Sequence, residues 1–352
     1  MVTALCPDAL RHLITDIYSR LGLSPDDAAL MSDTLVQADM WGHSSHGVMR
    51  TSWYGSRLQS GVMRPSGKAE IITDTGPLLH LDGHDGVGQL ITAHTAQMVI
   101  SRARQFGICC ASIRRSGHFG TAMYFTKQLA EAGMIGFLAT NASPAMPPWG
   151  GVEKLVGNNP QSWAAPTVSQ APFILDIAHT AVARGKIYLA REKAEPIPSD
   201  WALGPDGQPC TDPAQAILGS LLPMAGHKGF GMSAMMDILS GVLSGSAFGP
   251  DVVGPYVADK SSGAGHFMMA IDISKIRPVD DFTSDMAVMI KRWKDSQKAA
   301  LSDGIFYPGE KEYLHAQQRE TDGLSLPDNT LTSLLSYADS LDITTSLTAL
   351  KK

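Results

Sequence analysis

Residues 42–50 read Gly-His-Ser-Ser-His-Gly-Val-Met-Arg and lie between two segments that are both typical of helices. The preceding helix is predicted to begin at Ser24-Pro25-Asp26-Asp27, which offers a hydroxyl cap, a proline at the first helical position and acids in the first turn. The following helix is predicted to run to about Gln59, because Gly61 comes soon after. Folding alone does not explain two histidines, two hydroxyls and an arginine at one turn, so we interpret residues 42–50 as a wall of an active site.

Beyond this turn, helical and strand-like patterns alternate along the chain. Helices are predicted at 7–40 (two of them), 88–106, about 121–132, 232–244 and over most of the chain after 280, and strands at 69–82 (two), 108–113, 134–140, 173–177 and 266–273. The alternation predicts an α/β or α+β layered fold. Because both chain ends are helical, we expect a mainly helical domain from 1–75 with 280–352, and an α/β domain over 76–279. The long loops 141–160 and 195–213 are expected to carry function.

The composition excludes several classes of partner. The chain has 352 residues, 44% of them hydrophobic, and a formal net charge of -6, which is unfavourable for binding nucleic acid or an anionic membrane. Apolar runs such as Met134–Ala139 are too short to span a bilayer, and Met1–Leu10 has no features of a signal peptide. The four cysteines show no CxxC or zinc spacing. We therefore expect a cytoplasmic protein that works on small molecules.

Two specific chemistries can be tested against residues 42–50. The segment half-resembles the hydrolase elbow G-x-S-x-G, but His46 stands in place of the second glycine and the flanking elements look helical, so we do not expect a serine hydrolase. His43 and His46 could share a metal, but no third ligand is indicated and no metal is expected. Ser45 could instead fix the tautomer of His46, and Arg50, one helical turn beyond, suits a carboxylate. The alternative is a capping serine, a packed histidine and a surface arginine.

His118 is the second candidate, because it lies between Gly117 and Gly120 at a predicted strand-to-helix turn. A histidine there can act as a general acid or base near neutral pH, or it can simply satisfy backbone carbonyls. Asp176 and Lys186, each taken alone, are better explained as a cap or a solvated charge than as site residues.

The third candidate is Gly226–Gly231, which contains Lys228 and opens an apolar helix. Glycines and a lysine at a helix start are typical of a phosphate site, although they also allow close helix packing. The segment is not a P-loop, and no G-x-G-x-x-G follows a predicted strand, so we do not expect a Rossmann domain.

Taken together, these stretches resemble the type-2 malate/L-lactate dehydrogenase family over roughly residues 5–345. The matching segments occur in the family's order: His43–Arg50 (D/H-S-H-G-x-x-R), Ser116–Gly120 (S-x-H-[FY]-G), Pro148–Gly151 with Gly157–Pro160 (P-x-G-G…G-T-N-P), Asp176–Ala178 (D-x-A), Gly185-Lys186 (G-K), Ile197-Pro198 with Trp201 and Thr211–Pro213 (I-P…W…T-D-P), Leu222–Gly231 (L-P-x-x-G-x-K-G-x-G) and Leu239–Gly249 (L-S-G-x-L-S-G…F-G). Relatives in this family include ureidoglycolate and sulfolactate dehydrogenases and cyclic imino-acid reductases.

The resemblance implies a non-Rossmann fold, a homodimer, and hydride transfer between C4 of the nicotinamide of NAD or NADP and a small 2-oxo or 2-hydroxy carboxylic acid. It implies that His118 is the proton donor and acceptor, that Ser45, His46 and Lys186 belong to the catalytic group, and that Arg50, Tyr54 and Asn158 contact the substrate. The cofactor contacts that it implies are His118, Asn141, Asp176, Ile177, Ala178, Lys228, Gly229, Gly263 and Gly265.

Two departures leave the substrate open, because Asn158 replaces the family's usual threonine and Ala142 its usual serine. The alternatives are a reductase of cyclic imino acids such as piperideine- or pyrroline-2-carboxylate, and a non-catalytic binding protein on the same fold. Imine reductases resemble this chain but carry an aspartate where Lys186 stands, which favours the hydroxy-acid branch. NAD and NADP also stay open, since Arg191 and Lys193 could hold a 2′-phosphate or be solvated charges.

Overall fold

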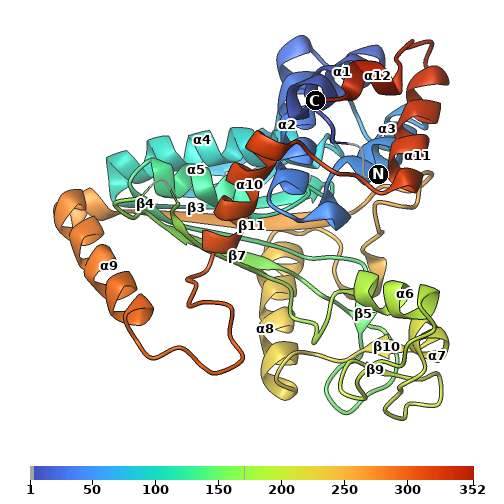
Figure 1. Cartoon of the computed structure of the whole chain (residues 1–352). Helices are drawn as coiled ribbons and strands as arrows, with labels where there is room; N and C mark the ends of the chain where they lie inside the picture. Colours follow the sequence, from blue (N-terminus) through green and yellow to red (C-terminus); the bar gives the residue numbers. More distant parts are fainter. Residues whose placement is uncertain (1–3, 170) are drawn as a thin grey trace.

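A seven-stranded sheet runs through the middle of the molecule in the order β1-β2-β3-β11-β4-β7-β8 (Figure 1). Its strands are β1 (Glu70–Asp74), β2 (Leu78–Asp82), β3 (Ile108–Ser116), β4 (Met134–Thr140), β7 (Gln161–Ala165), β8 (Phe173–Ile177) and β11 (Ala264–Asp272). Neighbouring strands are antiparallel except β2 and β3, which are parallel. The central strand β11 pairs Met268 with Ala111 of β3 on one side and with Leu138 of β4 on the other. The computed structural model describes residues 4–169 and 171–352.

Helices cover both faces of this sheet. The helices are α4 (Gly88–Phe106) and α5 (Met123–Glu131) on one face, and α8 (His227–Asp237), which continues as a π-helical turn Ile238–Val242, on the other (Figure 1). Side chains of β4 alternate between these layers, because successive residues of a strand point to opposite faces. Leu138 packs into the core shared with α4 and α5, whereas Phe137 and Ala139 pack with Met236 of α8.

The two ends of the chain build a second core together. Its elements are α1 (Pro7–Arg20), α2 (Pro25–Met40), α3 (Thr51–Gln59), α11 (Asp328–Asp339) and α12 (Leu347–Leu350). Leu5 and Leu324 exchange two backbone hydrogen bonds of 2.8 Å, which fasten the ends to one another. The expected contribution of both chain ends to one helical core is therefore present.

Two elements lie outside this helical core although they fall within 1–75 and 280–352. β1 pairs with β2 at the edge of the sheet, and α9 (Val279–Lys294) lies at the end of the sheet away from α1 and α2 (Figure 1). α10 (Glu310–Asp322) follows α9 and lies beside α2. Where the boundaries between two domains fall stays a prediction.

A third, separate core forms a small lobe below the sheet (Figure 1). Its elements are β5 (Pro144–Met146), β6 (Val156–Gly157), α6 (Arg184–Glu192), β9 (Ala202–Leu203), α7 (Pro213–Leu218) and β10 (Ser220–Leu221). The prediction of two structureless loops at 141–160 and 195–213 is therefore wrong in part. Strands of two or three residues are too short to produce a periodic pattern, so the sequence does not reveal them.

Most other predicted elements are confirmed. The differences include β7, α7 and β10, which are not predicted from the sequence, α8, which begins at His227 instead of residue 232, and the short α12, which follows the helix expected to be the last. Gly229 lies inside α8 and close to the carbonyl oxygen of Met224. The position requires glycine because a Cβ there would collide with this oxygen. Among the described residues, no helix is long and apolar enough to cross a membrane.

Leu334→Ala is expected to lower the free energy of unfolding by about 2–5 kcal/mol, because its side chain is 3% exposed in the core that both chain ends share. Leu301→Ala is the matched control, since that leucine is fully exposed and its truncation should change stability by less than about 0.5 kcal/mol. Urea unfolding measures both variants. Equal midpoints for the two would contradict the shared core.

Candidate active site

A buried carboxylate shapes the turn at residues 42–50. Asp39, which is 2% exposed, accepts a hydrogen bond of 2.6 Å from the backbone N–H of Val48, and a Cβ on Gly47 would collide with this carboxylate. Burial raises the pKa of Asp39 to about 6, although the Val48 N–H opposes the shift. Asp39 is missing from the residues singled out from the sequence. The sequence does contain a signal that could have identified Asp39: it is an acidic residue in the last turn of a helix, where the helix dipole disfavours negative charge.

The turn brings four of the expected residues together. The rings of His46 and His118 are stacked at 5.4 Å with an interplanar angle of 20°. Ser45 Oγ lies 2.9 Å from His46 Nδ1, and Tyr54 Oη lies 2.6 Å from His118 Nδ1. Tyr54 is on α3 and His118 is in the loop after β3, so the turn, α3 and this loop meet at one point. The expected pairing of Ser45 with His46 is therefore present in the structure.

The hydrogen bonds of His118 define its resting tautomer. The backbone N–H of Gly120 donates to His118 Nδ1 over 3.1 Å, so this nitrogen is an acceptor and the ring proton is on Nε2. The Tyr54 hydroxyl then donates to the same Nδ1. Gly117 packs against the start of α4, where a Cβ on Gly88 would collide with the Gly117 carbonyl. Nδ1 is thus held by the protein, and Nε2 is the nitrogen left for a ligand.

Burial and nearby positive charge keep both histidines neutral. Burial, and then the Arg50 guanidinium, lower the pKa of His118 well below its usual value, and the same two causes lower the pKa of His46 to about 3. Arg50 donates from Nε to the carbonyl oxygen of Ser45 over 2.6 Å, and its guanidinium stacks 4.3 Å above the Trp53 ring. Its terminal NH₂ groups can therefore receive a carboxylate in a fixed orientation. An anion bound there would offset the field that now disfavours protonation of His118.

A recess of about 330 Å³ opens beside the turn. It is lined by His43, Met123, Ile174, Leu175, Asp176, Phe306, Tyr307, Pro308, Gly309, Lys311 and Glu312. Asp176 accepts hydrogen bonds from Met123 N (2.8 Å) and Thr121 Oγ1 (2.9 Å), and burial raises its pKa. Thr121 also bonds His43, whose Nε2 lies 3.7 Å from a Glu312 carboxylate oxygen. Asp176, the only residue of the expected Asp176–Ala178 contact segment that lines the recess, is thus held rigidly in its wall.

Asn141 and Gly265 join the sheet to the π-helical turn. The Asn141 amide donates to Asp237 Oδ1 (2.9 Å) and to the Ala247 carbonyl (2.7 Å), while its oxygen accepts from Gly265 N (2.9 Å). A Cβ on Gly265 would collide with the Ser240 carbonyl, and Gly263 has a φ of 63°. Their expected roles as cofactor contacts stay predictions, because these groups are engaged in holding the joint.

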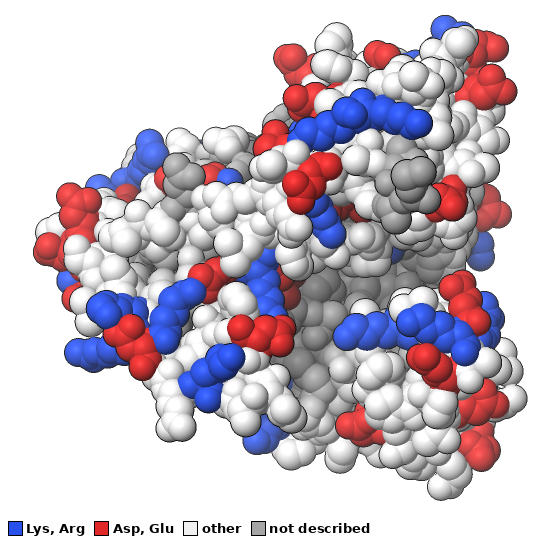
Figure 2. Space-filling view, viewed as in Figure 1, with Lys and Arg blue, Asp and Glu red and all other residues white. Residues whose placement is uncertain are grey.

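The structure keeps the remaining expected residues apart from the histidine pair. Asn158 accepts a hydrogen bond from His179 N through its carbonyl, and Lys228 is exposed in the first turn of α8. Lys186 is exposed on α6 of the separate lobe, where Figure 2 shows a row of lysine and arginine side chains. Within residues 4–169 and 171–352, no hydrogen bond or ion pair joins Asn158, Lys186 or Lys228 to His46 or His118. Arg191, also on α6, stacks on Tyr188.

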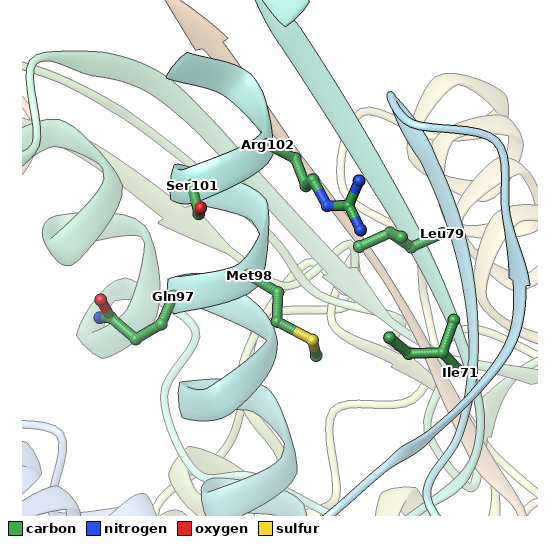
Figure 3. A pocket seen from close by; sticks show the side chains of 6 residues that line it. All are labelled: Ile71, Leu79, Gln97, Met98, Ser101 and Arg102. Carbon is green, nitrogen blue, oxygen red and sulfur yellow. The ribbon is translucent and has the colours of Figure 1, made fainter. Parts of the chain in front are cut away.

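A second recess, of about 420 Å³, lies elsewhere on the molecule, over the C-terminal half of α4 (Figure 3). It is lined by Ile71, Leu79, Gln97, Met98, Ser101 and Arg102. Arg102 forms an ion pair with Asp74, so the charge in this recess is already matched. None of the six residues that line this recess is a histidine or an acid, in contrast to the residues gathered at the turn at residues 42–50.

Comparison with known proteins identifies the family of the chain. The malate/L-lactate dehydrogenase family model matches residues 5–335. A malate dehydrogenase of Pyrococcus abyssi is 36% identical over 336 residues, which cover 93% of this chain and 92% of that protein. Two other relatives differ in the cofactor that their names give. Ureidoglycolate dehydrogenase (NAD(+)) of Escherichia coli is 32% identical, and (2R)-3-sulfolactate dehydrogenase (NADP(+)) of Chromohalobacter salexigens is 31% identical.

Solved structures show the same fold over nearly the whole chain. Sulfolactate dehydrogenase of Methanocaldococcus jannaschii superposes with a TM-score of 0.92 at 31% identity, covering 97% of this chain and 98% of the other. Delta1-piperideine-2-carboxylate reductase of Pseudomonas syringae superposes with a TM-score of 0.83 at 26% identity, covering 95% and 99%. The non-Rossmann fold expected from the motifs is confirmed, and the chain belongs to the malate/L-lactate dehydrogenase family.

Proposed function

We propose that the protein is an NAD(P)-dependent dehydrogenase of a small 2-hydroxy carboxylic acid, with His118 as the acid and base. The observation that carries the proposal is the position of His118, whose Nδ1 is held by Tyr54 and Gly120 and whose ring stacks on His46. Malate, sulfolactate and ureidoglycolate, after which the relatives are named, are all 2-hydroxy acids. We take the substrate of this chain from the same class.

Arg50 would bind the substrate carboxylate and His118 would serve its hydroxyl. In reduction, hydride adds to the carbonyl carbon, the C=O π electrons move to oxygen, and the Nε2–H of a protonated His118 transfers its proton to that oxygen. In oxidation the ring proton of neutral His118 first has to lie on Nδ1, where the Tyr54 hydroxyl oxygen can accept its hydrogen bond, and Nε2 then takes the substrate hydroxyl proton as the hydride leaves. Because burial and Arg50 lower the pKa of His118, the carboxylate must arrive before the imidazolium becomes stable. Substrate binding and proton uptake are thereby linked.

The recess beside the turn fits part of a dinucleotide. Met123, Ile174 and Phe306 give it apolar walls that suit a planar ring, and Asp176 and Glu312 give it carboxylates that accept hydrogen bonds from ribose hydroxyls. NAD or NADP bound there supplies or accepts the hydride. The exposed Lys228 at the start of α8, with Gly229 allowing close packing behind it, is a second place for a phosphate.

A reductase of cyclic imino acids is the second candidate, because the piperideine-2-carboxylate reductase structure shares the fold over almost the whole chain. Such a substrate also has a carboxylate for Arg50 and needs a proton at nitrogen. The family resemblance implies that such reductases carry an aspartate at the position of Lys186, so this position distinguishes the two candidates. A lysine has no carboxylate to accept a hydrogen bond, so Lys186 cannot take the place of the aspartate in a Ser-His-Asp relay with Ser45 and His46, which favours the hydroxy-acid reaction.

Absorbance at 340 nm, with NADH and NADPH against a panel of 2-oxo acids and cyclic imino acids, tests the function. We expect turnover of 2-oxo acids and a loss of roughly 10²–10⁴-fold in kcat for His118→Ala, the usual contribution of general acid catalysis. His12→Ala, an exposed histidine of α1, is the control and should keep full activity. Faster reduction of imino acids would favour the second candidate. No turnover with either cofactor would favour a binding protein.

Arg50→Gln is expected to move the acidic limb of kcat/KM for hydroxy-acid oxidation to higher pH. In the free enzyme this limb reports the pKa of His118, which the Arg50 charge helps to lower. The same variant should lose about 2–4 kcal/mol of transition-state binding, because the carboxylate loses its partner. Arg50→Lys keeps the charge and should keep the position of the limb. An unchanged limb in Arg50→Gln would contradict the electrostatic role.

We also propose that the protein is a homodimer, and the exposed apolar face of α8 and the π-helical turn supports this. Met232, Met235, Ile238 and Val242 are 37%, 45%, 47% and 55% exposed at helical spacing on one face, and a second copy of the chain would cover them.

The four cysteines are free thiols, in keeping with the cytoplasm expected from the sequence.

Light scattering should give the wild-type protein twice the mass of one chain, and the Met235→Glu, Val242→Glu double variant the mass of a single chain. Two charges in the middle of an apolar interface would be buried without partners. Leu218→Glu, at a leucine that is 65% exposed on α7, is the control and should leave the mass unchanged. A double variant that keeps the wild-type mass would rule out this face as the interface.

A further inference from the structure

Strained backbone positions meet just before His118 in the chain. Among the described residues, seven residues other than glycine have a positive φ, and three of these lie in one contact: His84 (50°), Asp85 (57°) and Arg115 (48°). The backbone N–H of Asp85 donates to the Arg115 carbonyl oxygen over 2.8 Å, which joins the turn after β2 to the end of β3. Side chains disfavour this left-handed conformation, so it persists only where the surrounding structure enforces it.

The buried carboxylate of Asp82, the last residue of β2, holds two of these positions. Its side chain is 1% exposed. Arg115 donates to it in a two-point fork, from Nε to Oδ1 over 2.8 Å and from Nη2 to Oδ2 over 2.6 Å. Arg114 Nε donates to Oδ2 over 2.8 Å, and the backbone N–H of His84 donates to Oδ1 over 2.9 Å. Asp82 therefore binds one left-handed residue through its side chain and another through its backbone.

His84 holds the same guanidinium from the solvent side. Arg115 Nη2 donates to His84 Nδ1 over 2.8 Å, so the proton of the neutral ring is on Nε2, which lies 2.8 Å from Glu70 Oε2. The side chains of His84 and Glu70 are 34% and 60% exposed. Because exposed ion pairs contribute little, we assign the main restraint on Arg115 to the buried Asp82.

Arg115 lies in a bulge of β3 that leads towards the active site. Between its pairs with Ala264 and His266 of β11, β3 contains one more residue than β11 does. Such a bulge bends its strand, and bulges beside active sites re-aim side chains. β3 ends one residue after Arg115, and His118 lies two residues beyond that end. The conformation of Arg115 therefore sets the direction in which the chain leaves the sheet towards Tyr54.

We propose that Asp82 is a positioning residue for the proton transfer, because it holds Arg115 in the left-handed conformation that aims His118 at its partners. Tyr54 Oη lies 2.6 Å from His118 Nδ1 and belongs to a different segment, so a small displacement of the loop after β3 would separate the two. Asp82 acts through the backbone of Arg115. The proposal rests on the proposed role of His118. The alternative is an ion pair that only stabilises the edge of the sheet.

The test is the kinetics of reduction of the best 2-oxo acid in the panel. Asp82→Asn keeps the shape of the side chain but removes its charge, and should lower kcat about 10–100-fold, the cost of a displaced catalytic group. KM for the 2-oxo acid should change less than about 3-fold, because Arg50 is on another segment. Asp74→Asn is the matched control, since Asp74 lies on the neighbouring strand β1 and pairs with Arg102, and it should leave kcat unchanged.

A second substitution at Arg115 tests the left-handed conformation directly. In the Asp82→Asn background, Arg115→Gly should restore kcat to within about 3-fold of the wild type, because glycine adopts a positive φ freely. Arg115→Ala removes the same guanidinium but disfavours a positive φ, so kcat should stay at the level of Asp82→Asn. An ion pair that only stabilises the sheet would make the two double variants alike.

Wild-type kcat in a folded Asp82→Asn variant would overturn the proposal, as would equal kcat in the glycine and alanine double variants. Urea unfolding shows whether each variant is folded. If Asp82→Asn does not fold, Arg115→Gly and Arg115→Ala are compared in the wild-type background, where the glycine variant should have about 10-fold higher kcat and equal values would overturn the proposal. Failure of the proposed function is separate, because it would show as full activity in His118→Ala.

Discussion

The hydrogen bond from Val48 N–H to the buried carboxylate of Asp39 is the contact on which the active site depends. It turns the chain sharply between α2 and α3, so that the side chains of Ser45, His46 and Arg50 extend from one short segment towards the loop after β3. Gly47 is required because any larger residue would collide with this carboxylate. The turn therefore needs the acid and the glycine together, and its polar side chains are placed by a group that has no role in the proposed chemistry.

The surroundings of His118 that result are positively charged, and none of the side chains that act on this ring is an acid. Burial lowers the pKa of His118 most, and Arg50, His46, His266 and Arg57 add to this effect, so the ring is neutral in the free protein. A carboxylate substrate supplies the missing negative charge. Specificity for an anionic substrate and the protonation of His118 then have one electrostatic cause. This explains why a carboxylate in the substrate matters to the reaction and not only to binding.

The scaffold holds this site between separate packing units. The sheet with α4 and α5 supplies His118, and the core built from both chain ends supplies the turn at residues 42–50. The two units meet where Tyr54 contacts His118 and where the His46 and His118 rings stack. The third core carries Lys186 and the basic row of α6. Residues that are expected from motifs to act at one site are therefore distributed over bodies with independent hydrophobic cores.

Local pattern in the sequence was sufficient for most of the helices and for the longer strands. Ser24 caps α2 as expected, Gly107 ends α4 in a left-handed conformation, and β4 and β8 have their predicted bounds. The pairing of Ser45 with His46 was also predictable, because adjacent residues meet whatever the fold. β5, β6 and β9 were not, since such short strands exist only through the partners they pair with.

The sequence by itself determined the family, the element types and the chemical identity of the candidate residues, because these depend on local pattern and on the order of motifs. Tertiary structure alone decided which of them meet. It stacks His46 on His118, it directs Tyr54 to His118 Nδ1, and it leaves Lys186 exposed on another lobe. It also explains Asp39, whose importance comes from its burial beneath the turn. Burial and distance between remote segments are properties of the packed chain, so no pattern of neighbouring residues encodes them.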